Sequence, residues 1–99
     1  MPYEHDVKTA VIDAEDTFTD WMNIQGIFQI HISNLVDATL TFQGSPNGGE
    51  DEHDLVEFTS AADNGLYVDT VAVTNWVYRI GCKTGDFGSE DRIYVRLEA

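Results

Sequence analysis

The sequence is poor in cysteine and in basic side chains. Its single cysteine, Cys82, excludes any disulfide within the chain, and this count is not that of a small secreted scaffold built on disulfides. Only 5 Lys and Arg residues stand against 18 Asp and Glu residues, which gives a formal net charge of -13. Because phosphate binding needs a basic surface, we expect no nucleic-acid partner, and an anionic membrane would repel the chain for the same reason.

Long apolar runs are also missing. No stretch approaches the roughly 20 apolar residues of a membrane-spanning helix. The first residues, 1–6, lack the basic region and apolar run of a signal peptide. We therefore expect a soluble protein made in the cytosol. The 99 residues suffice for one domain, and a hydrophobic fraction of 42% is that of an ordinary globular protein.

Hydrophobic residues recur with a period of two along most of the chain, which is typical of half-buried β-strands. Helix-forming residues are scarce and β-branched residues are common. Strands are predicted at 26–33, 37–43, 55–60, 75–83 and 93–97, with further short or edge strands at 9–12, 17–22 and 66–74. The core-facing residues predicted by this alternation are Phe28, Ile30, Ile32, Ala38, Leu40, Phe42, Val56, Phe58, Trp76, Tyr78, Ile80, Cys82, Ile93, Val95 and Leu97.

Turn signals separate these strands. The strongest is 45–49, Ser-Pro-Asn-Gly-Gly, followed by 63–65, by 84–88 and by Asn34. Short strands at regular spacing with no convincing helix predict an all-β fold of two antiparallel sheets packed face to face. We expect a single β-sandwich domain over 1–99, immunoglobulin-like or jelly-roll-like, with residues 1–8 as a short extended N-terminal arm.

Candidate catalytic residues are few. Cys82 could act as a nucleophile with His31 or His53 as its base. However, Cys82 shares the alternating face of Tyr78 and Ile80, which favours a buried structural thiol. No phosphate-binding loop and no Ser-His-Asp signature is present. We expect no enzyme activity, no catalytic residue and no cofactor.

The acidic run 50–54, Glu-Asp-Glu-His-Asp, is the one candidate for cation binding. Its acids are contiguous, whereas calcium loops alternate their ligands. A solvated acidic turn explains the run equally well, and we assign no metal site to it.

Four of the five basic residues fall within 79–99. Alternation places Arg79 and Lys83 on the outward face of one predicted strand, and Arg92, Tyr94 and Arg96 on the outward face of the next. If the two strands pair, these side chains form a small basic patch on an acidic body. Arginine and tyrosine are enriched in protein interfaces, so this face is our candidate contact with an acidic patch on another protein.

A second interpretation stays open, in which these cations pair with local carboxylates such as Glu57 and Asp69. The N-terminal arm is the other candidate contact, because an arm can add a strand to a neighbouring subunit. Its interface residues are taken as Tyr3 and Val7.

Three segments of the chain form a recognisable set. They are the strand pair 26–32 and 38–43, the turn 45–49, and the run 78–87, Tyr-Arg-Ile-Gly-Cys-Lys-Thr-Gly-Asp-Phe, with a closing Val-Arg-Leu at 95–97. In this order they resemble a family of small β-sandwich virion proteins of tailed bacteriophages. The run 78–87 is the most specific of these, and the likeness covers about residues 20–98. The turn departs from the family pattern, because Pro46-Asn47 stands where an aspartate is usual and no tryptophan follows the glycines.

The resemblance implies a structural part of a phage particle. The leading expectation is a capsid decoration (cement) protein on the outer shell, which binds the major capsid protein and its own copies, the latter as a homotrimer. A neck, tail or head-fibre component is the first alternative. A carbohydrate-binding module for host attachment is the second, and it would present exposed aromatic residues such as Trp21, Tyr67 or Tyr94.

Overall fold

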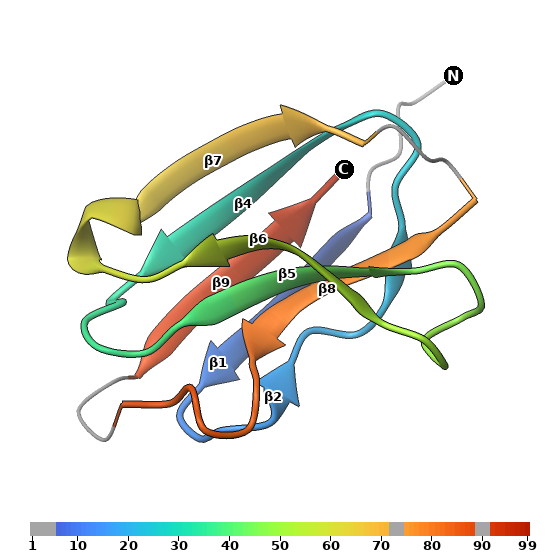
Figure 1. The fold of residues 1–99 in the computed structure, drawn as a ribbon. Helices are drawn as coiled ribbons and strands as arrows, with labels where there is room; N and C mark the ends of the chain where they lie inside the picture. The colour runs from blue at the N-terminus through green and yellow to red at the C-terminus, as the bar shows by residue number, and fades with distance from the viewer. Residues whose placement is uncertain (1–5, 72–74, 89–91) are drawn as a thin grey trace.

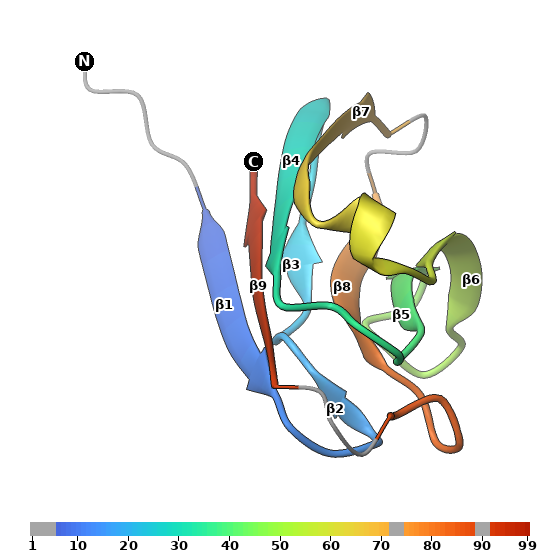
Figure 2. The same cartoon turned by 90° about the vertical axis from the view of Figure 1, so that its left-hand side faces the viewer.

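The computed structural model describes residues 6–71, 75–88 and 92–99. They form two antiparallel sheets packed face to face, as the alternation predicted (Figures 1 and 2). Sheet A has the order β1-β9-β4-β7, and sheet B has the order β2-β8-β5-β6 with β3 also paired to β8. The bounds are β1 Val7–Ile12, β2 Thr17–Phe18, β3 Met22–Asn23, β4 Ile27–Ser33, β5 Leu40–Ser45, β6 His53–Phe58, β7 Gly65–Thr70, β8 Val77–Cys82 and β9 Ile93–Glu98.

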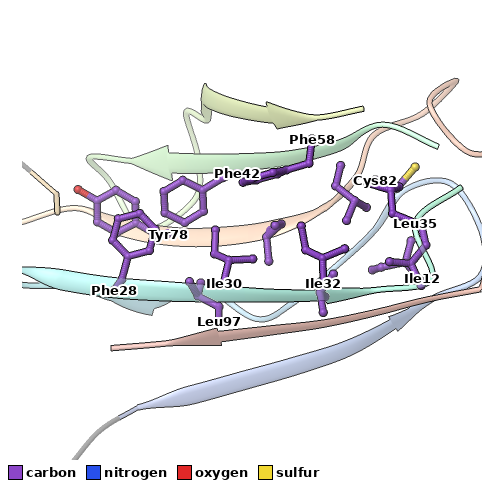
Figure 3. Packing of buried hydrophobic residues seen from close by; sticks show 14 of the residues in the cluster. Ile12, Phe28, Ile30, Ile32, Leu35, Phe42, Phe58, Tyr78, Cys82 and Leu97 are labelled. Carbon is purple, nitrogen blue, oxygen red and sulfur yellow. The ribbon is translucent and has the colours of Figure 1, made fainter. Parts of the chain in front are cut away.

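The core lies between the sheets and contains the residues that the period of two placed there (Figure 3). Of the predicted inward residues, only Val56 and Trp76 are half-buried rather than buried. The Phe42 ring stacks between two others, with centroid distances of 4.9 Å to Phe28 and 5.6 Å to Tyr78. Burial of these side chains supplies the main stabilisation of the fold, at about 1.5–3 kcal/mol for each large one.

Strand β5 is buried on both faces, which the alternation did not predict. Its outward residues Thr41, Gln43 and Ser45 are as inaccessible as Leu40 and Phe42. The strand lies between β8 and β6, and β2 pairs with the other side of β8. A Cβ added at Gly81 would collide with the Thr17 carbonyl oxygen, so glycine is required at this approach.

Several boundaries differ from the sequence prediction. The predicted strand 37–43 begins at Leu40, because the Thr39 amide instead donates to the Asp86 carbonyl. The predicted strand 17–22 is two short strands, β2 and β3, that pair with β8. A bulge opposite Phe42 and Gln43 leaves Leu55 unpaired in β6. Residues 72–74 of the predicted strand 66–74 lie outside the described residues.

The N-terminal arm is shorter than predicted. Val7 and Lys8 belong to β1 and pair with Glu98 and Leu97 of β9. Asp6 and Ala99 extend this ladder by exchanging two backbone hydrogen bonds, of 3.2 and 3.0 Å. Of the predicted arm 1–8, the residues that precede Asp6 lie outside the described residues, Tyr3 among them.

The predicted turns lie where the sequence placed them. Asn34 has a positive φ of 66°, and Gly48, Gly49, Gly65 and Gly85 also adopt positive φ values. A 3₁₀ turn, Ala61–Asp63, precedes β7 and is capped by Ser60 and Asp63.

Candidate interaction surface

The predicted basic patch does not form, because its two strands do not pair. Strand β8 lies in sheet B between β5 and the short strands β2 and β3, and β9 lies in sheet A between β1 and β4. Arg79 and Lys83 therefore face outward from sheet B, while Tyr94 and Arg96 face outward from sheet A. Arg92 is exposed directly before β9. The candidate residues are divided between opposite faces of the sandwich.

Arg79 packs against its own domain. Its guanidinium carbon lies 3.9 Å from the centroid of the Phe18 ring and 4.4 Å from that of the Trp21 ring. Its Nε donates a 2.9 Å hydrogen bond to Oε1 of the buried Gln43. Burial lowers the pKa of Arg79, and the negative charge of Glu52 opposes this shift. The stacked, hydrogen-bonded guanidinium stabilises the outer side of sheet B.

Lys83 forms an ion pair with a local carboxylate. Its Nζ lies 2.6 Å from Oδ2 of Asp54, and Oδ1 of the same carboxylate accepts a 2.9 Å hydrogen bond from Gln43 Nε2. Both hydrogen bonds lower the pKa of Asp54, and the bond from Lys83 has the larger effect. The same bond raises the pKa of Lys83. Local pairing is thus the arrangement on sheet B, although the partner is Asp54 rather than Glu57 or Asp69.

Arg79 and Lys83 also line a surface depression of about 330 Å³. Asp16 and Glu52 line it with them, so two acids accompany two cations. This depression does not provide the uncompensated positive charge that contact with an acidic partner would require.

Sheet A has a different outer face. The cross-strand register aligns three outward rows across its strands. The rows are Val7, Glu98, Gln29 and Val68; then Thr9, Arg96, His31 and Leu66; then Val11, Tyr94 and Ser33. Ile27 and Thr70 extend this face beyond the first row. We call this set of residues the sheet A face.

Large apolar side chains are concentrated on the sheet A face. Ile27 is 71% exposed, Leu66 62%, Tyr94 58% and Val68 55%, and Val7 is also exposed. Among the described residues, the other exposed large hydrophobic side chains are Val36 and Leu55. An exposed apolar group of this kind is informative, because half-exposed sheets ordinarily turn polar residues to water.

Charge is low on the sheet A face, although the whole chain carries a net charge of -13. Of the basic residues predicted to form a patch, Arg96 lies on this face. Its Nε is 3.4 Å from Oε1 of Glu98. Glu98 also accepts a 2.8 Å hydrogen bond from Gln29. The two charges of the face therefore neutralise each other, which makes this surface suited to contact with another protein.

Tyr94 and Arg96 were predicted to face outward, and Val7 was predicted as a contact residue of the N-terminal arm, whereas Ile27, Leu66 and Val68 were not predicted as contact residues. The signal was available: with Phe28, Ile30 and Ile32 inward, Ile27 begins β4 on the opposite side. Leu66 and Val68 flank Tyr67, which turns inward against Phe28 and Phe58. Apolar residues on the nominally polar side of a strand mark the face.

A second apolar feature is a cleft of about 270 Å³ at the side of the sandwich where β6 and β7 are the terminal strands. The β6 bulge directs Leu55 and Val56 toward it, and Asp69 and Thr70 of β7 provide polar groups beside them. The aromatic lining residues are Phe28, Phe42, Trp76 and Tyr78. Such a cleft can accept a small apolar group.

The acidic run 50–54 is held by local hydrogen bonds. Asp51 accepts a 2.7 Å bond from Asn47 Nδ2, and its amide donates to Asn47 Oδ1. Ser45 Oγ donates to Asn47 Oδ1 and accepts from the Gly49 amide, which closes the turn. Within the described residues, no three His, Cys, Asp or Glu side chains gather as a metal-binding group.

The thiol considered as a nucleophile is buried. Cys82 is 0% exposed, and its Sγ lies 3.7 Å from the Lys83 carbonyl oxygen. His31 is exposed on the sheet A face, and His53 lies beside the Trp76 ring with centroids 5.5 Å apart. The described residues thus place neither imidazole next to the thiol in a nucleophile–base pair.

Two of the three aromatic residues suggested for glycan binding are not exposed platforms. Tyr67 is half-buried and donates a 2.7 Å hydrogen bond to Asp69 Oδ2, which raises the pKa of Tyr67. Trp21 is half-buried beneath Arg79 and lies against the turn glycine Gly49. Tyr94 alone of the three is exposed.

No protein-family model matches this chain, and no curated protein or solved structure matches it either. No helix in the described part of the chain has the length and apolarity needed to cross a membrane.

Proposed function

We propose that this chain is a non-catalytic structural protein of a virion, a capsid decoration protein that docks on the outer shell of a tailed bacteriophage through its sheet A face. Its partner is the major capsid protein, and its location is the capsid surface. The identity of the assembly rests on the resemblance of residues 20–98 to small phage virion proteins.

The observation that carries the docking proposal is the coincidence of exposed apolar area and low charge. Ile27, Leu66, Val68 and Tyr94 lie on one sheet face whose charges, Arg96 and Glu98, pair with each other. The rest of the chain supplies the large negative charge, which repels other copies of the same particle and keeps particles dispersed. Binding of many copies to a symmetric shell also tolerates a modest contact for each copy.

The experiment is a quantitative protein gel of purified particles produced from the genome that encodes this chain. A decoration protein is present in hundreds of copies, in a fixed ratio to the major capsid protein. About a dozen copies would instead support a neck or tail ring. Absence of the chain from washed particles would overturn the proposal.

A further inference from the structure

The two terminal strands of sheet A, β1 and β7, each have one open side. In the part of the chain that the structure describes, β1 pairs only with β9 and β7 pairs only with β4. Figures 1 and 2 show β1 and β7 at opposite edges of the sheet. An open strand edge presents unpaired N–H and C=O groups that another chain can use.

The hydrogen-bond pattern identifies which residues present those groups. Asp6 and Ala99 exchange both of their backbone hydrogen bonds, and residues opposite each other in an antiparallel pair alternate between bonded and non-bonded pairs. Val7, Thr9 and Val11 therefore direct their backbone groups away from β9. On β7, the Val71 amide donates to the Gly26 carbonyl, so Val71 and Gly26 form a bonded pair with β4. By the same alternation, the β7 residues that direct their backbone groups away from β4 are Leu66, Val68 and Thr70.

Strand direction and side-chain facing agree with this pattern. The order β1-β9-β4-β7 is antiparallel at each step, so β1 and β7 run in opposite directions. The residues with outward backbone groups belong to the sheet A face on both strands. A second copy in the same orientation can therefore add its β7 to β1 and continue the antiparallel sheet with its sheet A face on the same side.

We propose that copies of this chain associate head to tail, β1 of one copy pairing with β7 of the next, with Thr9 opposite Val68. In this register Val7 lies opposite Thr70 and Val11 opposite Leu66, and all six residues of each strand find partners. Three bonded pairs give roughly six backbone hydrogen bonds.

Charge favours this contact over pairing of like edges. Lys8 and Asp69 are on the core-facing side of their strands, because they pair with Leu97 and Phe28. A charge in this position normally discourages edge pairing. In the head-to-tail register, however, Lys8 falls directly opposite Asp69 of the next copy, and opposite charges across an antiparallel pair are stabilising.

Like-edge pairing lacks this complementarity. Two β1 strands centred on Thr9 place Lys8 opposite Ala10 of the other copy and bring the two lysines into diagonal positions. Two β7 strands centred on Val68 place Asp69 opposite Tyr67 of the other copy and bring the two aspartates into diagonal positions. Opposite charges at the two edges thus select the heterologous contact, which closes into a ring when the rotation between copies permits it.

Asp69 has to give up one local contact in the assembly. Its Oδ1 now accepts a 2.7 Å hydrogen bond from the Thr70 amide, one of the outward-directed groups, and its Oδ2 accepts from Tyr67. In the pair of strands the Thr70 amide donates to Val7 of the next copy, and the released carboxylate oxygen meets Lys8. The carboxylate therefore covers the edge in the single copy and binds across it in the assembly.

This inference goes beyond docking on a shell, because it defines a contact between copies that the purified chain alone can show. A closed ring of three copies would be the homotrimer expected from the sequence. Failure of the chain to appear in particles would leave this contact unaffected, and failure of self-association would leave docking through the sheet A face unaffected.

The test is sedimentation equilibrium of the purified full chain over a range of concentrations. We expect complexes of more than two copies. Lys8→Glu and Asp69→Lys should each weaken association roughly tenfold, by replacing an attractive pair with a repulsive one. The double variant, which exchanges the charges, should associate within about threefold of the original chain. Asp20→Lys, with the same charge change as Asp69→Lys at an exposed site away from both edges, should not weaken association.

Thr9→Pro provides a variant that removes a backbone donor of the β1 edge without changing the charge. It removes an amide that points away from β9, so the fold should be retained and association lost. Circular dichroism and thermal unfolding confirm that each variant is folded. A chain that stays monomeric at every concentration, a complex that stops at two copies, or a double variant that associates no better than the single variants would overturn the proposal.

Discussion

Nε of Arg79 donates a 2.9 Å hydrogen bond to Oε1 of Gln43. This bond joins β8 to β5 on the outer side of sheet B and directs the guanidinium along the sheet rather than into solvent. The guanidinium also stacks on the Phe18 and Trp21 rings, so Arg79 stabilises the domain. The docking role proposed for the chain therefore belongs to sheet A, where Arg96 and Tyr94 lie.

Substitution of Arg79 should lower stability without altering association. Arg79→Met removes the guanidinium that stacks on both rings and leaves Oε1 of the buried Gln43 without this donor. We expect the free energy of unfolding to fall by about 1–2 kcal/mol. Urea unfolding measures this change, and Arg92→Met, at an exposed position, should change it by less than about 0.5 kcal/mol. Equal effects of the two substitutions would contradict the structural role of Arg79.

A pair of glycine substitutions tests the close approach of β2 to β8. In Gly81→Ala the new Cβ would meet the Thr17 carbonyl oxygen and the Phe18 backbone, and we expect a loss of about 3 kcal/mol. Gly26→Ala meets no atom within 4 Å and should change stability by less than about 0.5 kcal/mol. Thermal unfolding of both variants gives the comparison. A tolerated alanine at position 81 would show that β2 does not lie where the structure places it.

The ion pair between Lys83 and Asp54 predicts a dependence of stability on pH. Because the pKa of Asp54 is lower in the folded than in the unfolded chain, its ionisation stabilises the fold above the ordinary value of 3.8. That contribution is lost as the pH falls through the folded pKa. At pH 7, Asp54→Asn should cost about 0.5 kcal/mol, since the pair is partly exposed.

Below the folded pKa of Asp54 the difference between Asp54→Asn and the original chain should disappear, because the protonated carboxyl no longer pairs with Lys83. Urea unfolding at neutral and at acidic pH measures it, with Asp20→Asn as a control for the loss of one exposed charge. A difference that persists at low pH would mean that the ion pair is not its source.

The period of two was sufficient to predict the two-sheet fold and most of its core, although the buried residues Ile12, Met22, Ile24 and Leu35 were not among the predicted inward residues. Phe28, Ile30 and Ile32 show why. Apolar residues at every second position of a strand share one side of the sheet, and their burial is favourable only when that side faces the core. The turn glycines and Asn34 were predictable for a similar local reason, since positive φ values favour these residues.

Sheet membership was not predictable in this way. The alternation in β8 and β9 predicts which side chains face inward. The same alternation is expected whether the two strands pair within one sheet or lie in opposite sheets across the core. Neighbours in sequence often pair, and that tendency gave the predicted basic patch. In the structure the chain between Cys82 and Ile93 passes from sheet B to sheet A, which separates Arg79 and Lys83 from Arg96.

The sheet A face predicts which substitution impairs docking. Val68→Glu adds a charge beside the exposed apolar residues Ile27 and Leu66 and should reduce binding to shells that lack the chain at least tenfold. Val36→Glu changes an equally exposed apolar residue outside that face and should bind normally. Co-sedimentation with the shells measures both, after thermal unfolding has shown that each variant is folded. Equal loss in both variants would indicate a general effect of negative charge.

The most direct test of docking through sheet A is hydroxyl-radical footprinting of the chain free and on particles. The account predicts that Tyr94 and Leu66, exposed in the free chain, become protected on the particle. Phe18 and Trp21, on the outer side of sheet B, should react equally in both states. Protection of Phe18 and Trp21 with unchanged reactivity of Tyr94 and Leu66 would contradict it.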